Sequence, residues 1–294
     1  AILRIRRQGV DKETIYTCYV TAKDRRLLGL VTVKDLLLAD NDDIRIEELM
    51  QENISDLIYV NTKTDQEQVA LMFNKYNFLA IPVVDGEGRM VGIVTFDDAM
   101  DVMEDEATED IEMMAAMMPS EKPYLKNTVF ELFLHRIPWL LILMLSATFT
   151  GMVTTHYEEA FVSLPLLVSF MPMLMDTAGN CGNQISTLMV RGLALGEVEP
   201  ADFLKVLAKE LRVSAIVGAV LGVVNGLRIY LMYTFIFAGQ YDNVMGYAIV
   251  VSVSLFFSVI LAKLVGGMLP LAAKKLGADP AIMATPFITT IVDA

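Results

Sequence analysis

Hydrophobic and polar positions divide the chain into two parts. In residues 1–126, short apolar runs alternate with charged residues, as in a soluble domain. Residues 137–294 contain long apolar stretches, and each complete stretch reaches the ~20 residues that a helix needs to cross a bilayer. The pattern predicts five membrane spans, the last one cut short, at 137–155, 160–190, 213–238, 244–270 and 281–294.

Basic residues gather in alternate connections between these spans. Lys and Arg lie before the first span, between the second and third, and after the fourth, whereas the loops at 156–159 and 239–243 have none. Because basic residues favour the cytoplasmic side, we expect a multi-pass protein of the cell (inner or plasma) membrane with its soluble part in the cytoplasm. Arg228 falls inside the third span, where it would either reach the interface or line a cavity.

The soluble part contains an internal repeat. Residues 27–37 and 90–100 share one pattern at an offset of 63 positions, with a turn, a β-branched strand and an acid that opens a helix. Further strands are predicted at 15–20 and 80–84, and residues 66–76 have the apolar spacing of a helix. This pattern resembles a pair of cystathionine-β-synthase-type (CBS) domains, which implies an α+β fold. The two domains are placed at 1–52, incomplete, and 53–103.

CBS pairs can bind adenosine nucleotides through a Thr/Ser-x-x-Asp corner. Thr32 with Asp35, and Thr95 with Asp98, have this spacing. The resemblance therefore implies a nucleotide site, with ATP as a possible ligand. In the alternative interpretation, each Thr and Asp only cap a helix.

An acidic segment joins the two parts. Residues 97–112 contain nine acids and no base, and like charges four residues apart destabilise a helix. Helical spacing places Glu106, Glu109 and Asp110 on one face. The segment is either an exposed acidic linker or a surface that senses cations, and we favour the second because it leads directly into the membrane part. We place a connecting helix at 97–120, a linker at 121–136 and an all-α transmembrane domain at 137–294.

The second span is unusually polar for a membrane helix. Asp176, Asn180, Asn183 and Gln184 are costly in lipid, and Pro172, Gly179 and Gly182 are expected to loosen the helix. Close packing through small residues explains the glycines. It does not explain the polar side chains, so we predict that this span lines a pore.

The fifth span ends with an acid inside its apolar run. Asp293 follows Thr289 and Thr290, and helical rise from Ala281 places it about 18 Å into the bilayer. An acid at such a depth costs roughly 2.5–3.5 kcal/mol, so it normally faces a partner, a cavity or an ion.

Composition narrows the cargo and excludes other classes. A net charge of −13 argues against nucleic acid as a partner and suits a protein that handles cations. With two Cys, two His and many carboxylates, the chain favours a hard cation such as Mg²⁺, Ca²⁺ or Mn²⁺ over Zn²⁺ or Cu²⁺. We find no nucleophile–base pair, phosphate loop or metal triad, and therefore do not expect an enzyme.

Four features together resemble the MgtE family of magnesium channels. They are the CBS pair, the acidic helix, the run Asp-Thr-Ala-Gly-Asn-Cys-Gly-Asn-Gln at 176–184 and the segment from Pro286 to Asp293. The resemblance implies a homodimer with five spans per subunit, in which soluble domains sense Mg²⁺ and a plug helix closes the pore. It also implies roles for matching residues: in the pore for Asp293, Gly179 and Asn183; in the plug for Glu109 and Asp110; and in regulation for Asp98, Asp101 and Asp279. The family's acidic N-terminal domain is missing, and we take the chain to be a fragment cut at both ends.

We therefore expect a Mg²⁺-selective channel or transporter that intracellular Mg²⁺ closes. Two alternatives stay open: a membrane-anchored adenine-nucleotide sensor, and a transporter for Co²⁺ or Mn²⁺.

Overall fold

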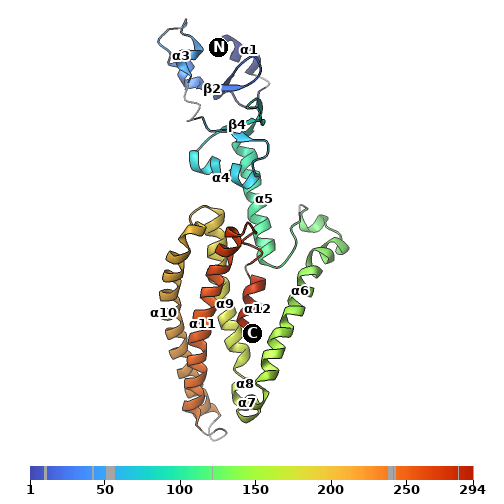
Figure 1. Ribbon diagram of the computed structural model, residues 1–294, viewed down its shortest axis with the longest axis vertical. Helices are drawn as coiled ribbons and strands as arrows, with labels where there is room; N and C mark the ends of the chain where they lie inside the picture. The colour runs from blue at the N-terminus through green and yellow to red at the C-terminus, as the bar shows by residue number, and fades with distance from the viewer. Residues whose placement is uncertain are drawn as a thin grey trace. The chain divides into compact units, whose positions relative to one another are not determined.

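The computed structural model describes residues 1–9, 12–41, 43–50, 57–120, 122–237, 241, 243–283 and 285–293, without the side chains of Gln8, Thr285, Pro286 and Asp293. The chain forms two compact units, Ala1–Ala107 and Thr108–Ala294, and each is described by itself. The first is α+β and the second is helical (Figure 1).

The sequence repeat of the first unit is also a structural repeat. Strands β1 (Thr17–Thr21) and β2 (Leu27–Thr32) form one antiparallel pair, and β4 (Ala80–Val84) and β5 (Met90–Thr95) form the other. The bounds of β2 and β5 differ by the predicted 63 positions, and the register of both pairs shifts at the equivalent place. The short strand β3 (Val60–Asn61) adds to β4 in parallel.

Helices complete the first unit. Its helices are α1 (Ile2–Gln8), α2 (Val33–Leu37), α3 (Ile46–Leu49), α4 (Gln66–Tyr76) and the first part of α5 (Phe96–Met114). Phe73 from α4, Ala99 from α5, and Val60 and Ile81 from the sheet form a buried core. The two hairpins are joined by backbone hydrogen bonds and by the hydroxyl of Tyr19, which donates to the carbonyl oxygen of Ala80 at 3.0 Å.

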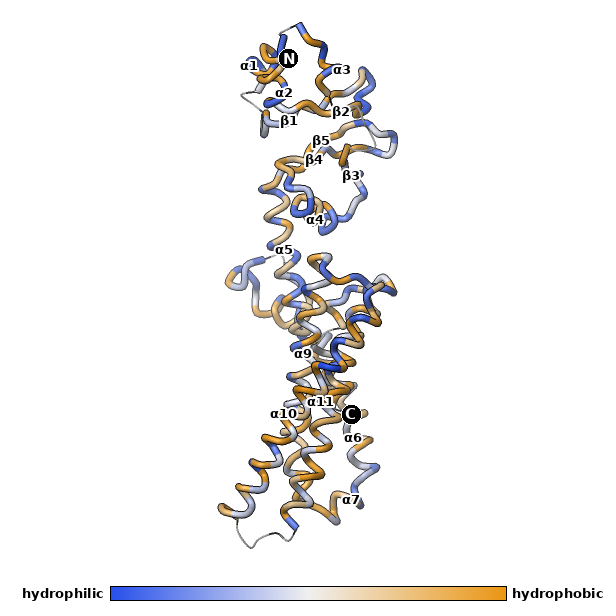
Figure 2. The backbone as a smooth tube through the Cα atoms, turned by 90° about the vertical axis from the view of Figure 1, so that its left-hand side faces the viewer, coloured by the Kyte–Doolittle hydropathy of each residue, from blue (hydrophilic) through white to orange (hydrophobic). Residues whose placement is uncertain are grey.

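The second unit is a helical bundle. It contains α6 (Val129–His156), α7 (Glu158–Ser163), α8 (Pro165–Val168), α9 (Met171–Ala194), α10 (Phe203–Leu231), α11 (Val244–Lys275) and α12 (Thr285–Asp293). Three described helical segments are long and apolar enough to cross a membrane: Val129–His156, Pro200–Ile236 and Val244–Lys275. In Figure 2, hydrophobic residues recur along α6, α10 and α11. The expected total of five spans is therefore only partly supported.

Several predicted boundaries were wrong. The segment predicted as one span at 160–190 is divided among α7, α8 and α9, and α9 runs unbroken through both glycines that were expected to loosen it. Pro172 stands in the first turn of α9, where a missing N–H costs no intrahelical hydrogen bond. Helix α5 ends at Met114, ahead of Pro119, because Ala116 adopts a left-handed conformation with a φ of 57°.

Close backbone approach holds the bundle together. A Cβ atom added to Gly182 of α9 would lie 2.6 Å from Cγ2 of Ile288 in α12 and 3.1 Å from the carbonyl oxygen of Ala262 in α11. Helix α12 also contacts α6, since Thr290 and Ser146 lie at hydrogen-bonding distance, 3.0 Å, and Trp139 meets Phe287 edge to face. Helix α12 therefore joins α6 to the rest of the bundle.

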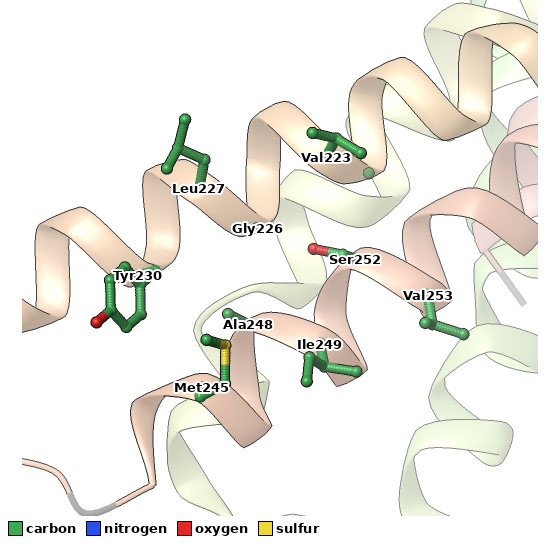
Figure 3. Close-up of a pocket in the computed structure, with 10 residues that line it drawn as sticks. Val223, Gly226, Leu227, Tyr230, Met245, Ala248, Ile249, Ser252 and Val253 are labelled. Carbon is green, nitrogen blue, oxygen red and sulfur yellow. The ribbon is translucent and has the colours of Figure 1, made fainter.

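Helices α10 and α11 pack against each other through small residues. Gly222 and Gly226 of α10 approach Ser252 of α11, whose hydroxyl points toward α10 (Figure 3). An apolar groove of about 440 Å³ follows this crossing.

Candidate ion pathway

Helix α9 has one polar and one apolar face. Asp176, Asn180 and Gln184 recur every four residues and are exposed, and Nδ2 of Asn180 donates to Oδ2 of Asp176 at 3.3 Å. The opposite face buries small and apolar residues, among them Cys181 and Ile185. Side chains four residues apart share a helix face. With the apolar face packed against other helices, the polar side chains form a continuous stripe that the described residues leave uncovered.

Gly179 and Asn183 lie one turn apart beside this stripe. Gly179 is buried, yet a Cβ atom added there would meet no atom of the described residues within 4 Å. Oδ1 of Asn183 is buried and has no hydrogen-bond partner among the described residues. An unpaired buried acceptor is costly, so this oxygen is suited to a ligand that donates hydrogen bonds, such as the water shell of a cation.

Helix α12 packs directly on α9 at this level. Ile288 contacts Gly182 and is fully buried, while Thr289 and Thr290 are half-buried. The backbone of Asp293 ends α12, but its side chain lies outside the described residues. The role of Asp293 in the pore therefore stays a prediction.

The last turn of α5 packs near the end of α9. Met113 and Met114 contact a buried pair, Val190 of α9 and Ala281. Oδ1 of Asp279 accepts a hydrogen bond from the backbone N–H of Ala281 at 2.7 Å. Because Glu109 and Asp110 precede Met113 by one turn, the predicted plug acids and Asp279 lie in the same region of the second unit.

The other predicted regulatory acids belong to the first unit. Oδ2 of Asp98 accepts from Oγ1 of Thr95 at 2.7 Å, and Oε1 of Glu106 accepts from Nε2 of Gln66 at 2.6 Å. Asp101 is exposed on α5. Among the described residues, no three His, Cys, Asp or Glu side chains are arranged to hold a metal ion.

The predicted nucleotide corner caps helices. Thr32 and Asp35 form a reciprocal capping box at the start of α2, with Oγ1 of Thr32 donating to Oδ2 of Asp35 at 2.6 Å. These hydrogen bonds hold the pKa of Asp35 below its usual value. Thr95 and Asp98 make the equivalent hydroxyl contact in the second repeat. Both corners satisfy their own polar groups, and nucleotide binding by them stays a prediction.

Comparison with known proteins identifies the same two parts. A family model described as a divalent cation transporter, MgtE, matches residues 171–294, and a CBS domain model matches residues 46–105. The magnesium transporter MgtE of Thermus thermophilus is 38% identical over 98% of the chain, and that of Enterococcus faecalis is 32% identical over all of it. This chain belongs to the MgtE family. It spans 61% of the length of both relatives.

A solved structure is also similar to a part of this MgtE-family chain. It is the cytosolic domain of the Mg²⁺ channel MgtE in complex with ATP, 46% identical, covering 34% of this chain and 40% of that one with a TM-score of 0.32.

Sequence reasoning missed several buried polar residues of the MgtE domain. Glu210 of α10 and Lys263 of α11 are 8% and 7% exposed, and the hydroxyl of Ser186 in α9 is fully buried without a partner among the described residues. The sequence did contain one indication of them, because Lys263 is the only cationic residue in the predicted apolar span at 244–270. Arg228, by contrast, is exposed and donates to Oδ1 of Asn225 at 2.8 Å.

Proposed function

We propose that the protein conducts Mg²⁺ across the cell membrane and that intracellular Mg²⁺ closes it. The observation that carries the proposal is the polar side of α9, where an open space beside Gly179 adjoins the unpaired oxygen of Asn183. This helix lies within the matched divalent cation transporter model, and two relatives are named magnesium transporters.

The pathway would bind Mg²⁺ with its water shell largely in place. Mg²⁺ dehydrates reluctantly and keeps several waters, so outer-sphere acceptors suffice to bind it. Asn183, Asn180 and Asp176 provide such acceptors along α9. On α12, Asp293 supplies a negative charge and Thr289 adds a hydroxyl group. Mg²⁺ is thus cargo and regulator, and Co²⁺ or Mn²⁺ are the competing substrates to be tested.

Closure of the ion pathway would depend on the acidic helix α5, which joins the two parts of the chain. Without Mg²⁺, the carboxylates of α5 repel one another and Asp279. With Mg²⁺, ions bridge Glu109, Asp110 and Asp279 in the second unit, and Asp98, Asp101 and Glu106 contribute from the first part of α5. The packing of Met113 and Met114 on Val190 and Ala281 supports a closed arrangement of this end.

A flux assay tests the pathway. We expect Asp293→Asn and Asn183→Leu, reconstituted in liposomes, to reduce Mg²⁺ uptake at least tenfold, because each removes a group that holds the hydrated ion. Glu158→Gln, an acid-to-amide change at an exposed site, is the control and keeps wild-type uptake. Undiminished uptake by Asp293→Asn would refute the pore assignment. Adding Co²⁺ or Mn²⁺ as competitors ranks the ions.

A second assay tests closure separately. Glu109→Gln, Asp110→Asn and Asp279→Asn together should leave a protein that conducts Mg²⁺ equally at low and millimolar internal Mg²⁺. Wild-type inhibition in this triple variant would exclude these acids from gating while leaving the transport proposal intact.

A further inference from the structure

Two oppositely charged side chains are buried in the membrane bundle away from the proposed pathway. Glu210 of α10 and Lys263 of α11 are 8% and 7% exposed. Oε2 of Glu210 has no hydrogen-bond partner among the described residues, and neither side chain forms an ion pair with any of them. A charge left alone in such a place is strongly destabilising, so each requires compensation.

The register of the two helices places these residues opposite each other. Cβ atoms added to Gly218 and Gly222 of α10 would approach Phe256 and Ser252 of α11, and one added to Gly226 would approach both Ser252 and Ala248. Contacts on α11 therefore move backward as those on α10 move forward, and the two helices run antiparallel in a nearly constant register; Figure 3 shows the crossing at Gly226. Two more turns toward the start of α10, the same register sets Glu210 opposite Leu264, next to Lys263.

A second contact agrees with this register. A Cβ atom added to Gly267, which lies one turn from Lys263 on α11, would be 3.8 Å from Cγ of Glu210. The acid therefore lies against the stretch of α11 that carries the lysine.

Both residues also extend faces that enter one core. Leu255 and Val259 of α11 pack with Cys181 of α9 and with Val217 and Leu221 of α10. Lys263 follows Val259 by four residues, and Glu210 precedes Val217 by seven. Both intervals return a helix to nearly the same face, so the two side chains belong to the α9–α10–α11 core.

We propose that Glu210 and Lys263 form a buried ion pair bridged by ordered water within this core. Water suits the site because it donates to the unpaired Oε2 and accepts from the ammonium group, and buried waters typically join polar groups left unpaired by the protein. The pair makes the core behind α9 electrically neutral and fixes the register of α10 on α11. This inference does not depend on which ion is transported.

A double-mutant cycle tests the pair in the purified protein. Glu210→Gln and Lys263→Met preserve side-chain size and remove one charge each. We expect each single change to lower the midpoint of thermal unfolding by about 5 °C or more, because it leaves the other charge buried without a partner. The double variant should recover most of this loss. The matched controls are Glu158→Gln and Lys209→Met, both exposed, which should change the midpoint little and additively.

Additive losses in the double variant, or single variants as stable as wild type, would overturn the pair. If Lys263→Met does not fold, Glu210→Gln combined with Lys263→Gln supplies the neutral pair, and its folding supports coupling. High-resolution density adds an independent measurement. Water within hydrogen-bonding distance of both Oε2 and Nζ is expected, and an Oε2 bound to another protein group would refute the bridge.

Discussion

Thr32 and Thr95 occupy equivalent places in the two repeats, and each donates its hydroxyl to an acid three residues later. Oγ1 of Thr32 also accepts from the backbone N–H of Asp35, and so satisfies a donor that the helix itself leaves unpaired. The same atoms would be needed to hold a ribose or a phosphate. At the scale of single residues, the CBS corner is therefore already stabilised before any ligand arrives.

The first cap yields a stability prediction with a defined pH dependence. Thr32→Ala should lower the free energy of unfolding at pH 7 by about 1 kcal/mol, because the capping box is lost. The folded-state pKa of Asp35 is lowered from 3.8, so its contribution is present above that value and is lost as the pH falls through the folded pKa. The variant's deficit, measured by chemical unfolding, should therefore shrink below pH 3.8. Thr21→Ala, at an exposed strand end, is the control, and a pH-independent deficit would contradict the argument.

Variants of two glycines in α9 should distinguish an effect on helix packing from an effect on Mg²⁺ transport. Gly182→Ala forces a methyl group against Ile288 and the backbone of Ala262, so we expect a lower unfolding midpoint together with reduced uptake. Gly179→Ala meets no atom within 4 Å, so it should keep or slightly raise the midpoint while reducing Mg²⁺ uptake by narrowing the open space. Equal unfolding midpoints for the two variants would contradict this assignment.

At the scale of elements, α5 packs through its two ends. Its first part contacts α4 through Gln66 with Glu106 and through Asn74 with Met103, and its last turn contacts Val190 and Ala281. Between them, acids four residues apart repel each other. The middle of the helix is therefore the part most open to stabilisation by bound cations.

This predicts a cation-dependent protection of α5. Millimolar Mg²⁺ should slow amide hydrogen exchange in residues 104–112, because divalent ions reduce repulsion between neighbouring carboxylates. NaCl at equal ionic strength should do so less. Glu109→Gln with Asp110→Asn should lose most of the difference between the two salts. Equal protection by both salts in the wild-type protein would show general screening instead of ion binding.

Sequence patterns predicted some elements well because their causes are local. The offset between β2 and β5, and the bounds of α4, follow from β-branched runs and helical apolar spacing. The unbroken course of α9 was not predictable, because Gly182 is held in place by packing against α11 and α12, which lie far from it in sequence. Glu210 likewise lies against the stretch of α11 that carries Lys263 only because of the register of α10 on α11, which depends on contacts between distant segments.

At the scale of the whole molecule, α6 is the least covered of the three described helical segments that are long and apolar enough to cross a membrane. Leu141, Leu145 and Met152 are among its many exposed apolar residues, and its described contacts involve mainly α12 and α7. Lipid or a second copy of the chain can cover this face. We predict that the homodimer implied by the family resemblance places the second copy there.

Cross-linking can test this assembly. With Cys18 and Cys181 replaced by Ser and Ala, we expect Leu145→Cys on α6 to form an intersubunit disulfide in membranes, since equivalent residues near a two-fold axis approach each other. Phe257→Cys, equally exposed on α11, should not cross-link. The reverse pattern would move the interface from α6 to the opposite side of the bundle.

The position of α12 between α6 and α9 also has a consequence for biogenesis. Ribosomes make α6 before α12, yet α12 contacts α6 more extensively than any other described helix does. During translation, α6 must therefore wait in the bilayer, surrounded by lipid, until α12 arrives. A nascent chain released too soon would have the first unit and the packed helices α9, α10 and α11, but α6 would lack the contacts that α12 provides.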